Sequence, residues 1–208
     1  MKLCMFSPRE LDLERGWPGR IEGERVVQLA AQTLQAFFTG GGSAREHAQY
    51  PLDQVVLRAP VLHPPSIRLF DGDDFSFANP ASVYGPGEAV PLPAGADHVE
   101  LQERLAAVIG AGMIGGFTLM NEWLAPSLPG TKARDFAIAL GPVIVTVDEF
   151  AGGDVDWAAL LDHAELNTRF FPGDVIAGPV RRREGPLRAG DTVEHSNAAI
   201  GLLRNALG

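Results

Sequence analysis

The sequence is poor in cysteine and in basic residues, and each shortage excludes a class of protein. Cys4 is the single cysteine, which excludes an internal disulfide and a zinc site built from several thiolates. The 17 basic residues are outnumbered by 26 acidic ones, and the resulting net charge of −9 repels a phosphate backbone. We therefore expect no nucleic-acid partner.

Long apolar segments are also missing. No stretch approaches the roughly 20 apolar residues that a membrane-spanning helix needs. The N-terminal residues Met1–Gly16 contain no apolar stretch of the kind found in a signal peptide. Together with the single cysteine, these features predict a cytoplasmic protein with no membrane partner.

What is abundant indicates a globular chain with many turns. Of the 208 residues, 46% are hydrophobic and 21% are charged, which is typical of a folded domain. The 24 glycines and 16 prolines follow no repeat, so they indicate frequent turns and argue against a helical bundle.

The chain divides into two expected parts. Residues 1–62 form a small N-terminal lobe, and residues 66–208 form a mainly β domain beyond the prolines at 60, 64 and 65. Apolar runs predict strands in the segments Arg25–Leu29, Val55–Leu57, Asp97–Ile109, Phe117–Met120 and Val143–Val147. Two helices are expected, at 30–38 before a glycine run and at 156–166 with Asp156 as N-cap.

Few residues suggest chemistry on their own. The sequence has no nucleophile elbow, P-loop or zinc-protease motif, and its five histidines lack metal-ligand spacing. The acidic segment Asp71–Asp74 suits either a hard cation or a solvated turn. The run Arg181–Arg183 suits either an anion or solvent, and Lys132 precedes an apolar strand.

Six segments, taken in order, resemble the fumarylacetoacetate hydrolase family. They match its Gly-Pro-Gly entry to the catalytic lobe, two of its central strands, its Lys-x-x-Asp with a following Leu-Gly-Pro, its Pro-Gly-Asp turns, and its terminal Ile-Gly-x-Leu-Arg-Asn. The matching segments are Val83–Pro93, Arg104–Gly110, Gly116–Glu122, Lys132–Pro142, the two turns Pro172–Ile176 and Ala189–Val193, and Ile200–Asn205. Residues 1–62 also resemble the family's small N-terminal lobe.

The resemblance implies a fold and a chemistry. The implied fold is α+β and mainly β, a mixed β-roll or sandwich with few helices, usually dimeric. The family's enzymes use Mg²⁺ to hold a β-dicarbonyl or enol acid, which they hydrolyse, decarboxylate or isomerise. The implied partners of this chain are a small anionic dicarbonyl or enol acid and a second copy of the chain.

The family's metal-binding positions are altered in this chain. The positions of its two glutamates hold Gln102 and Arg104, and the position of its aspartate holds Glu122. Because a hard divalent ion needs several anionic oxygens and a guanidinium repels it, we expect no metal and no other cofactor. Glu100 shares strand parity with Gln102 and Arg104, whereas Glu103 faces the opposite side.

Other parts of the family's site are shortened. The lid segment with its catalytic histidine is reduced to Phe70–Phe77, the helix between the central strands to Ala111–Gly115, and the substrate loop between Val155 and Phe171 is lost. The family's Thr-Gly-Thr-Pro turn becomes Ala177-Gly178-Pro179, without its threonines. Lys132 matches the family's substrate-contacting lysine.

Three interpretations remain open. The first is an enzyme without the metal, with Lys132, Glu122 and Arg104 as catalytic residues. Its substrate would be bound by Lys132, Asp135, Gly178 and Gln102. The second is a non-catalytic member that binds a ligand or serves as a structural partner, because metal-assisted hydrolysis needs both an electrophile and a base. The third is a hydrolase with rearranged ligands.

Two structural predictions follow. Arg104 and Glu122 should form an ion pair that faces the same cavity as Lys132, with the remaining donors of Arg104 turned toward a substrate. A pair that only replaces the old site is the structural alternative. The chain should also form a homodimer, because the edges of a large β surface invite pairing.

Overall fold

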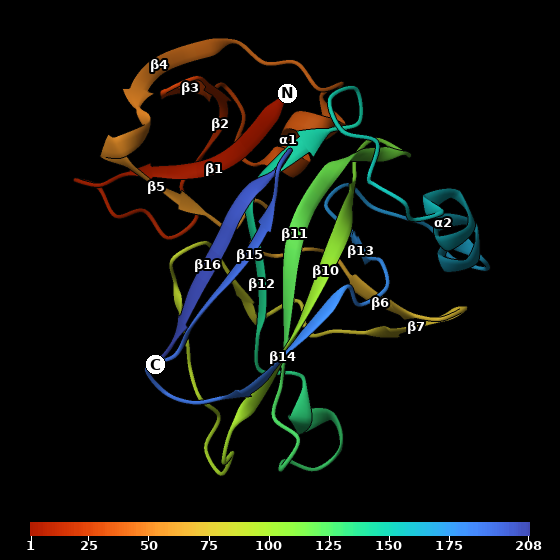
Figure 1. The fold of residues 1–208 in the computed structure, drawn as a ribbon. Helices are drawn as coiled ribbons and strands as arrows, with labels where there is room; N and C mark the ends of the chain where they lie inside the picture. The colour runs from red at the N-terminus through yellow and green to blue at the C-terminus, as the bar shows by residue number, and fades with distance from the viewer.

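The protein is built mainly from strands. A computed structural model describes all of residues 1–208 and contains one sheet of 13 strands, a second sheet of three, and two short α-helices (Figure 1). The expected α+β, mainly β class is confirmed.

The N-terminal region contributes five strands to one end of the large sheet. These elements are β1 (Lys2–Pro8), β2 (Trp17–Glu22), β3 (Arg25–Leu29), α1 (Leu34–Thr39), β4 (Glu46–Pro51) and β5 (Val55–Arg58). α1 begins later than expected because the Oγ1 of Thr33 caps it, accepting a hydrogen bond from Ala36 N–H. It ends at Gly40, as the glycine run predicts.

Three long antiparallel strands form the centre of the large sheet. They are β10 (Val99–Ile109), β11 (Ile114–Leu124) and β12 (Ile138–Thr146), and almost every side chain on them is buried. Their apolar runs suit this position because both faces of the sheet are covered. The expected strands are confirmed. β11 extends beyond its predicted bounds at both ends and β12 begins five residues earlier than predicted, whereas β10 begins two residues later, at Val99.

Shorter strands complete the two sheets. In the large sheet these are β6 (Ile67–Asp71), β7 (Asp74–Phe77), β8 (Val83–Tyr84), β13 (Val175–Ala177) and β14 (Arg182–Leu187). The small sheet contains β9 (Ala89–Val90), β15 (Thr192–Asn197) and β16 (Gly201–Leu207). Leu203 of β16 belongs to the same apolar core as Leu119 and Val143, so the small sheet covers one face of the central strands.

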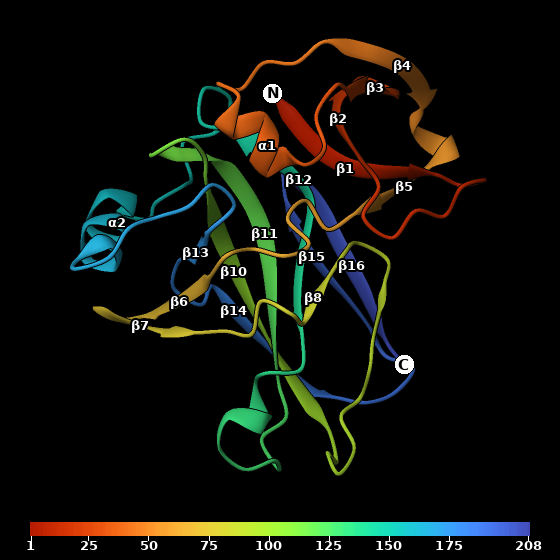
Figure 2. The same cartoon turned by 180° about the vertical axis from the view of Figure 1, so that it is seen from behind.

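The β6–β7 hairpin and α2 (Trp157–Glu165) lie on the same side of the molecule (Figure 2). Asp156 caps α2 by accepting a hydrogen bond from Ala159 N–H, as predicted. The ring of His163 lies 6.1 Å from that of Phe70 and 5.8 Å from that of Phe75, between ring centres. The helix therefore packs against the β6–β7 hairpin.

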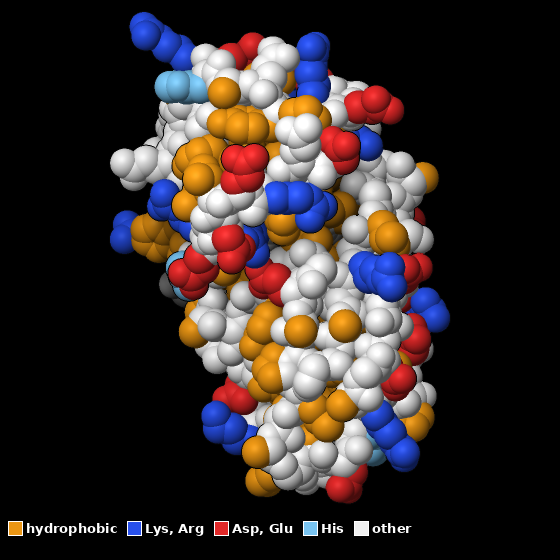
Figure 3. Space-filling view, turned by 90° about the vertical axis from the view of Figure 1, so that its left-hand side faces the viewer, with side chains coloured by type: hydrophobic (Ala, Val, Ile, Leu, Met, Phe, Trp, Pro, Cys, Tyr) orange, Lys and Arg blue, Asp and Glu red, His pale blue; other side chains and the backbone are white.

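The large sheet continues across the expected boundary between the two lobes. β1 pairs with β12, and Lys2 lies opposite Val145. The division into residues 1–62 and 66–208 stays a prediction. None of the helices is long and apolar enough to span a membrane. On the face in Figure 3, acidic and basic side chains are interspersed with small apolar groups.

Candidate active site

The candidate site lies on one face of the β10–β11 pair. Gln102 stands directly opposite Glu122, and Arg104 stands opposite Met120. Because side chains alternate along a strand, Gln102 and Arg104 share a face, and Glu122 is the diagonal neighbour of Arg104. The pairing register thus brings together the three positions that the sequence resemblance equates with metal ligands.

Arg104 and Glu122 form the predicted ion pair. The Nε of Arg104 donates to Oε2 of Glu122 at 2.9 Å, and Nη2 lies 2.9 Å from the same oxygen. Both side chains are 0% exposed. A pair buried this completely needs further hydrogen bonds to offset the loss of water.

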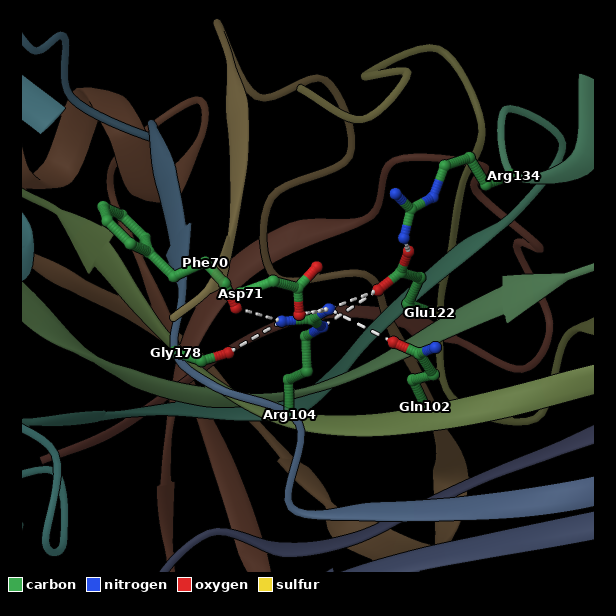
Figure 4. Close-up of polar contacts among 7 residues, drawn as sticks. All are labelled: Phe70, Asp71, Gln102, Arg104, Glu122, Arg134 and Gly178. Atoms are coloured by element: carbon green, nitrogen blue, oxygen red, sulfur yellow. Dashed lines mark hydrogen bonds and ion pairs between the residues drawn. The ribbon is translucent and has the colours of Figure 1, made fainter. Parts of the chain in front are cut away.

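Arg104 receives those bonds from the surrounding chain. Nη1 donates to the carbonyl oxygens of Phe70 at 2.7 Å and Gly178 at 3.0 Å. Nη2 donates to Asp71 Oδ1 at 2.9 Å and to Gln102 Oε1 at 3.2 Å (Figure 4). A guanidinium has five N–H groups, so all of them are used within the protein. The expectation that Arg104 keeps donors free for a substrate is wrong.

Arg134 is a site residue that the sequence did not reveal. Its Nη2 donates to Oε1 of Glu122 at 2.5 Å, so the two oxygens of this carboxylate are held by different arginines. The Arg134 side chain is 33% exposed, whereas that of Arg104 is enclosed. Arg134 follows the 3₁₀ turn Gly130–Ala133, two residues after Lys132. Its position next to Lys132 in the sequence could have indicated that Arg134 belongs to the site.

Lys132 lies outside the buried cluster. Its side chain is 73% exposed, and Nζ donates to Asp135 Oδ2 at 2.8 Å. Arg104 and Glu122, by contrast, are fully enclosed. The expectation that Lys132 faces the same cavity as the ion pair is therefore wrong, because Lys132 lies at the surface and is turned to Asp135. Lys132 and Asp135 pair with each other at the surface.

The residues present do not suit the Mg²⁺ of the family. No group of three or more histidine, cysteine, aspartate or glutamate side chains is placed to hold a metal ion. Among the three corresponding positions, only Glu122 supplies a carboxylate, and the guanidinium of Arg104 occupies the centre. A divalent ion at that position would meet a fixed positive charge.

A second polar cluster lies on the opposite face of the same strands. Glu103 stands opposite Asn121, and His195 of β15 lies over them, with Nδ1 3.0 Å from Asn121 Oδ1. Nε2 of His195 lies 4.0 Å from Glu103 Oε2, and Arg182 donates to Glu103 Oε1 at 3.1 Å. Glu103 faces away from Arg104, as its strand parity predicts.

Burial shifts the pKa values of this second cluster. Loss of water, with a smaller effect from the charge of Arg181, lowers the pKa of His195 to about 4. Desolvation also raises the pKa of Glu103, and the nearby Arg182 partly opposes that rise. Both shifts favour the neutral forms of the two groups.

Comparison with known proteins identifies the fold. No protein-family model and no curated protein matches the chain. A solved 5-carboxymethyl-2-hydroxymuconate delta-isomerase from Mycobacterium smegmatis matches with a TM-score of 0.80, at 22% identity over 100% of this chain and 99% of that one. Maleylpyruvate hydrolase from Sphingobium sp. SYK-6, bound to manganese and pyruvate, matches with a TM-score of 0.78, at 19% identity over 100% and 98%. The chain has the fumarylacetoacetate hydrolase fold.

A third structure extends the range of reactions found on this fold. It is a 2-keto-3-deoxy-D-arabinonate dehydratase bound to magnesium and 2,5-dioxopentanoate, with a TM-score of 0.81 at 17% identity over 100% of this chain and 98% of that one. The three neighbours are an isomerase, a hydrolase and a dehydratase. Fumarylacetoacetate hydrolase folds therefore carry different reactions, and the residues of the site must decide among them.

Proposed function

We propose that the protein isomerises a small β-keto or enol carboxylic acid by proton transfer, without the family's Mg²⁺. The support is a carboxylate, Glu122, that is fully buried and yet has one oxygen covered by a partly exposed side chain. Keto–enol isomerisation needs a base and no nucleophile. Two of the matching structures are named isomerases, and their names describe hydroxylated diene acids with two or three carboxylates.

Glu122 is the base in this proposal, and its two oxygens have different tasks. Oε2 stays on Arg104, which holds the carboxylate in position and touches no substrate. Oε1 is covered by Arg134 alone. The carboxylate of an anionic substrate draws Arg134 and the exposed Lys132 toward itself, because it competes with Glu122 for the same cation. That movement exposes Oε1 to the substrate.

The proton transfer then needs no further group. Oε1 takes a proton from the carbon next to the substrate carbonyl, the C–H electron pair forms the C=C bond, and the carbonyl pair moves onto oxygen. That oxygen receives the proton back, so substrate and product contain the same atoms. Because Arg104 has no donor left for the oxyanion that develops in this step, the proposal assigns its stabilisation to Arg134 and Lys132.

Hydrogen–deuterium exchange at the α-carbon tests this function. Purified protein in D₂O with a chelator should exchange the C3 protons of oxaloacetate or the methyl protons of pyruvate faster than buffer, as followed by proton NMR. Glu122→Gln should lower the exchange rate by about 100-fold or more, the usual loss for a general base. Glu103→Gln, on the opposite face, is the matched control and should leave the rate unchanged. Equal exchange in wild type and Glu122→Gln would refute the proposal.

A non-catalytic role is the second candidate, and one observation favours it. Every donor of Arg104 is satisfied inside the protein, which suits a site that only binds a ligand or supports a partner. The same samples separate the two candidates. Binding of oxaloacetate by calorimetry, without α-proton exchange, would indicate the ligand-binding role.

A homodimer is also proposed. The large sheet ends in two edge strands, β4 and β7, whose open main-chain groups invite pairing. Light scattering at micromolar concentration should give about twice the chain mass of 22.2 kDa. A mass equal to that of one chain would overturn the dimer.

A further inference from the structure

We propose that Arg68 forms a second ligand site, which binds a small apolar monocarboxylate. Arg68 and Asp71 are three residues apart on β6, so their side chains point to opposite faces of the β6–β7 hairpin. Asp71 reaches Arg104. Arg68 therefore faces the other way, toward Phe170 in the segment that follows α2. Binding there is independent of the proposed isomerase activity.

The guanidinium of Arg68 is buried, and part of it has no hydrogen-bond partner in the protein. The Arg68 side chain is 5% exposed, and its Nε and Nη1 atoms are enclosed without an acceptor. Arg104, in contrast, uses all five of its N–H groups within the protein. Because an enclosed charged donor without an acceptor is unfavourable, the free N–H groups of Arg68 favour an acceptor from outside the chain.

One carboxylate lies near Arg68, and it is already bound elsewhere. Oδ2 of Asp174 is 3.9 Å from Nη1 of Arg68, beyond hydrogen-bond distance. Oδ1 of Asp174 accepts from the Ser66 hydroxyl at 2.7 Å, and Oδ2 accepts from Phe171 N–H at 2.7 Å. Arg169 brings a second positive charge to the same segment, with its Cζ 4.8 Å from the Phe171 ring centre. Two arginines against one carboxylate leave one positive charge to be balanced, which favours a monoanion over a dianion.

Phenylalanine rings surround the guanidinium of Arg68 and supply apolar surface. The ring centres of Phe170, Phe77 and Phe75 lie 4.9, 5.6 and 5.8 Å from its Cζ atom, within the cation–π range. Phe77 is 65% exposed, and Phe171, the residue after Phe170, is 46% exposed. A ligand with an aromatic or short aliphatic body therefore gains by covering these rings, while its carboxylate pairs with Arg68.

The Phe77 side chain gives a route to the guanidinium. Phe77 stands opposite Arg68 in the β6–β7 pairing and is the last residue of β7, whose outer edge has no strand partner. Exposed side chains change rotamer within picoseconds to nanoseconds. Rotation of the Phe77 ring therefore uncovers Arg68 without any change in the sheet.

Calorimetric titration with three matched ligands tests the site in the wild type. Phenylacetate should bind with one-to-one stoichiometry. Phenylacetamide has nearly the same shape without the charge, and it should bind at least about tenfold more weakly because it loses a charged hydrogen bond. Phenyl phosphate, a dianion, should also bind more weakly, since its second charge is repelled by Asp174.

Two substitutions remove different parts of the site. Arg68→Gln should weaken phenylacetate binding by about tenfold or more, through loss of the charged hydrogen bond. Phe77→Ala should weaken it by about threefold, through loss of one aromatic contact. Arg45→Gln, at an exposed arginine just before β4, is the matched control and should leave binding unchanged.

Several outcomes would overturn the site. Equal binding of phenylacetate and phenylacetamide would remove the role of the charge, and unchanged binding in folded Arg68→Gln would remove Arg68. Tighter binding of phenyl phosphate would exclude the monocarboxylate class. No binding of phenylacetate in the millimolar range would leave water as the only partner of Arg68. If Arg68→Gln does not fold, contacts between phenylacetate and the Phe77 ring in proton NMR, assigned by their loss in Phe77→Ala, decide the question, and their absence refutes the site.

Discussion

The two faces of the β10–β11 pair both bury polar side chains, but their surroundings stabilise those side chains differently. On one face, Arg104 and Glu122 form an ion pair, and every N–H of the guanidinium has an oxygen partner. On the other face, His195 Nε2 lies 4.0 Å from Glu103 Oε2, and desolvation lowers the pKa of His195 and raises that of Glu103. Complete hydrogen bonding thus offsets the loss of water on the first face, whereas on the second face burial opposes the charged forms.

The elements that cover each face explain the difference. The Arg104 face is closed by the β6–β7 hairpin and the segment after β13, which bring main-chain carbonyls and Asp71 within hydrogen-bond distance. The opposite face is closed mainly by β15, which brings one imidazole. Asn121 Nδ2 has no hydrogen-bond partner there. Hydrogen bonds therefore fix the side chains on the Arg104 face, whereas on the opposite face a fall in pH can protonate His195.

Breaking the charged face should have the largest effect on stability. Glu122→Ala leaves the enclosed Arg104 without its main counter-charge and should lower the free energy of unfolding by about 3–5 kcal/mol. Urea denaturation of wild type and variant at pH 7 measures the difference. Glu103→Gln is the matched change on the other face and should cost less than about 1 kcal/mol, because the amide can still accept a hydrogen bond from Arg182 and desolvation already opposes the charged form of Glu103. Similar losses of unfolding free energy in the two variants would contradict the proposed difference between the two faces.

The face that carries His195 should make the free energy of unfolding depend on pH. Burial lowers the pKa of His195 to about 4 in the folded state, below its ordinary value near 6.5. The unfolded chain therefore binds a proton more readily, so stability is retained above pH 6.5 and is lost as the pH falls toward 4. At pH 5 this histidine should account for a loss of about 2 kcal/mol relative to pH 7.

His195→Gln tests that assignment. The variant should lose less stability than the wild type between pH 7 and pH 5, as measured by urea denaturation at each pH. Glu103 works in the opposite direction: its raised pKa lets the folded state keep a proton, so its own contribution falls as the pH rises. His163→Gln, at a partly exposed position, is the control. An unchanged pH slope in His195→Gln would remove His195 from this role.

The central strands and the ion pair could be read from the sequence, because both depend on local pattern. The apolar runs predict β10, β11 and β12, and the two-residue period places Gln102 and Arg104 on one face. The pairing with Glu122 needed the family resemblance as well, since the register of two strands is not encoded in either one alone.

The other hydrogen-bond partners of Arg104 depended on tertiary placement. Asp71 reaches Arg104 because the β6–β7 hairpin folds over this face of the sheet, and the sequence left this aspartate as either a cation ligand or a solvated turn residue. The carbonyls of Phe70 and Gly178 carry no side-chain signature at all. The choice of Lys132 over Arg134 followed the family motif, whereas the loop geometry turns Arg134 inward and leaves Lys132 at the surface.

Lys132 should therefore show the smallest effect on stability and a separate effect on ligand binding. Its bond to Asp135 is a surface ion pair, and such pairs contribute at most about 1 kcal/mol, so Lys132→Ala should change unfolding by less than about 0.5 kcal/mol. If Lys132 helps Arg134 to hold a substrate carboxylate, the same variant should weaken oxaloacetate binding by about tenfold in calorimetry, the loss of one charged hydrogen bond. Arg25→Ala, another exposed cation far along the sequence, is the control and should leave binding unchanged. Unaltered binding in Lys132→Ala would mean that Arg134 alone binds the ligand's anionic group, while Arg104 only positions Glu122.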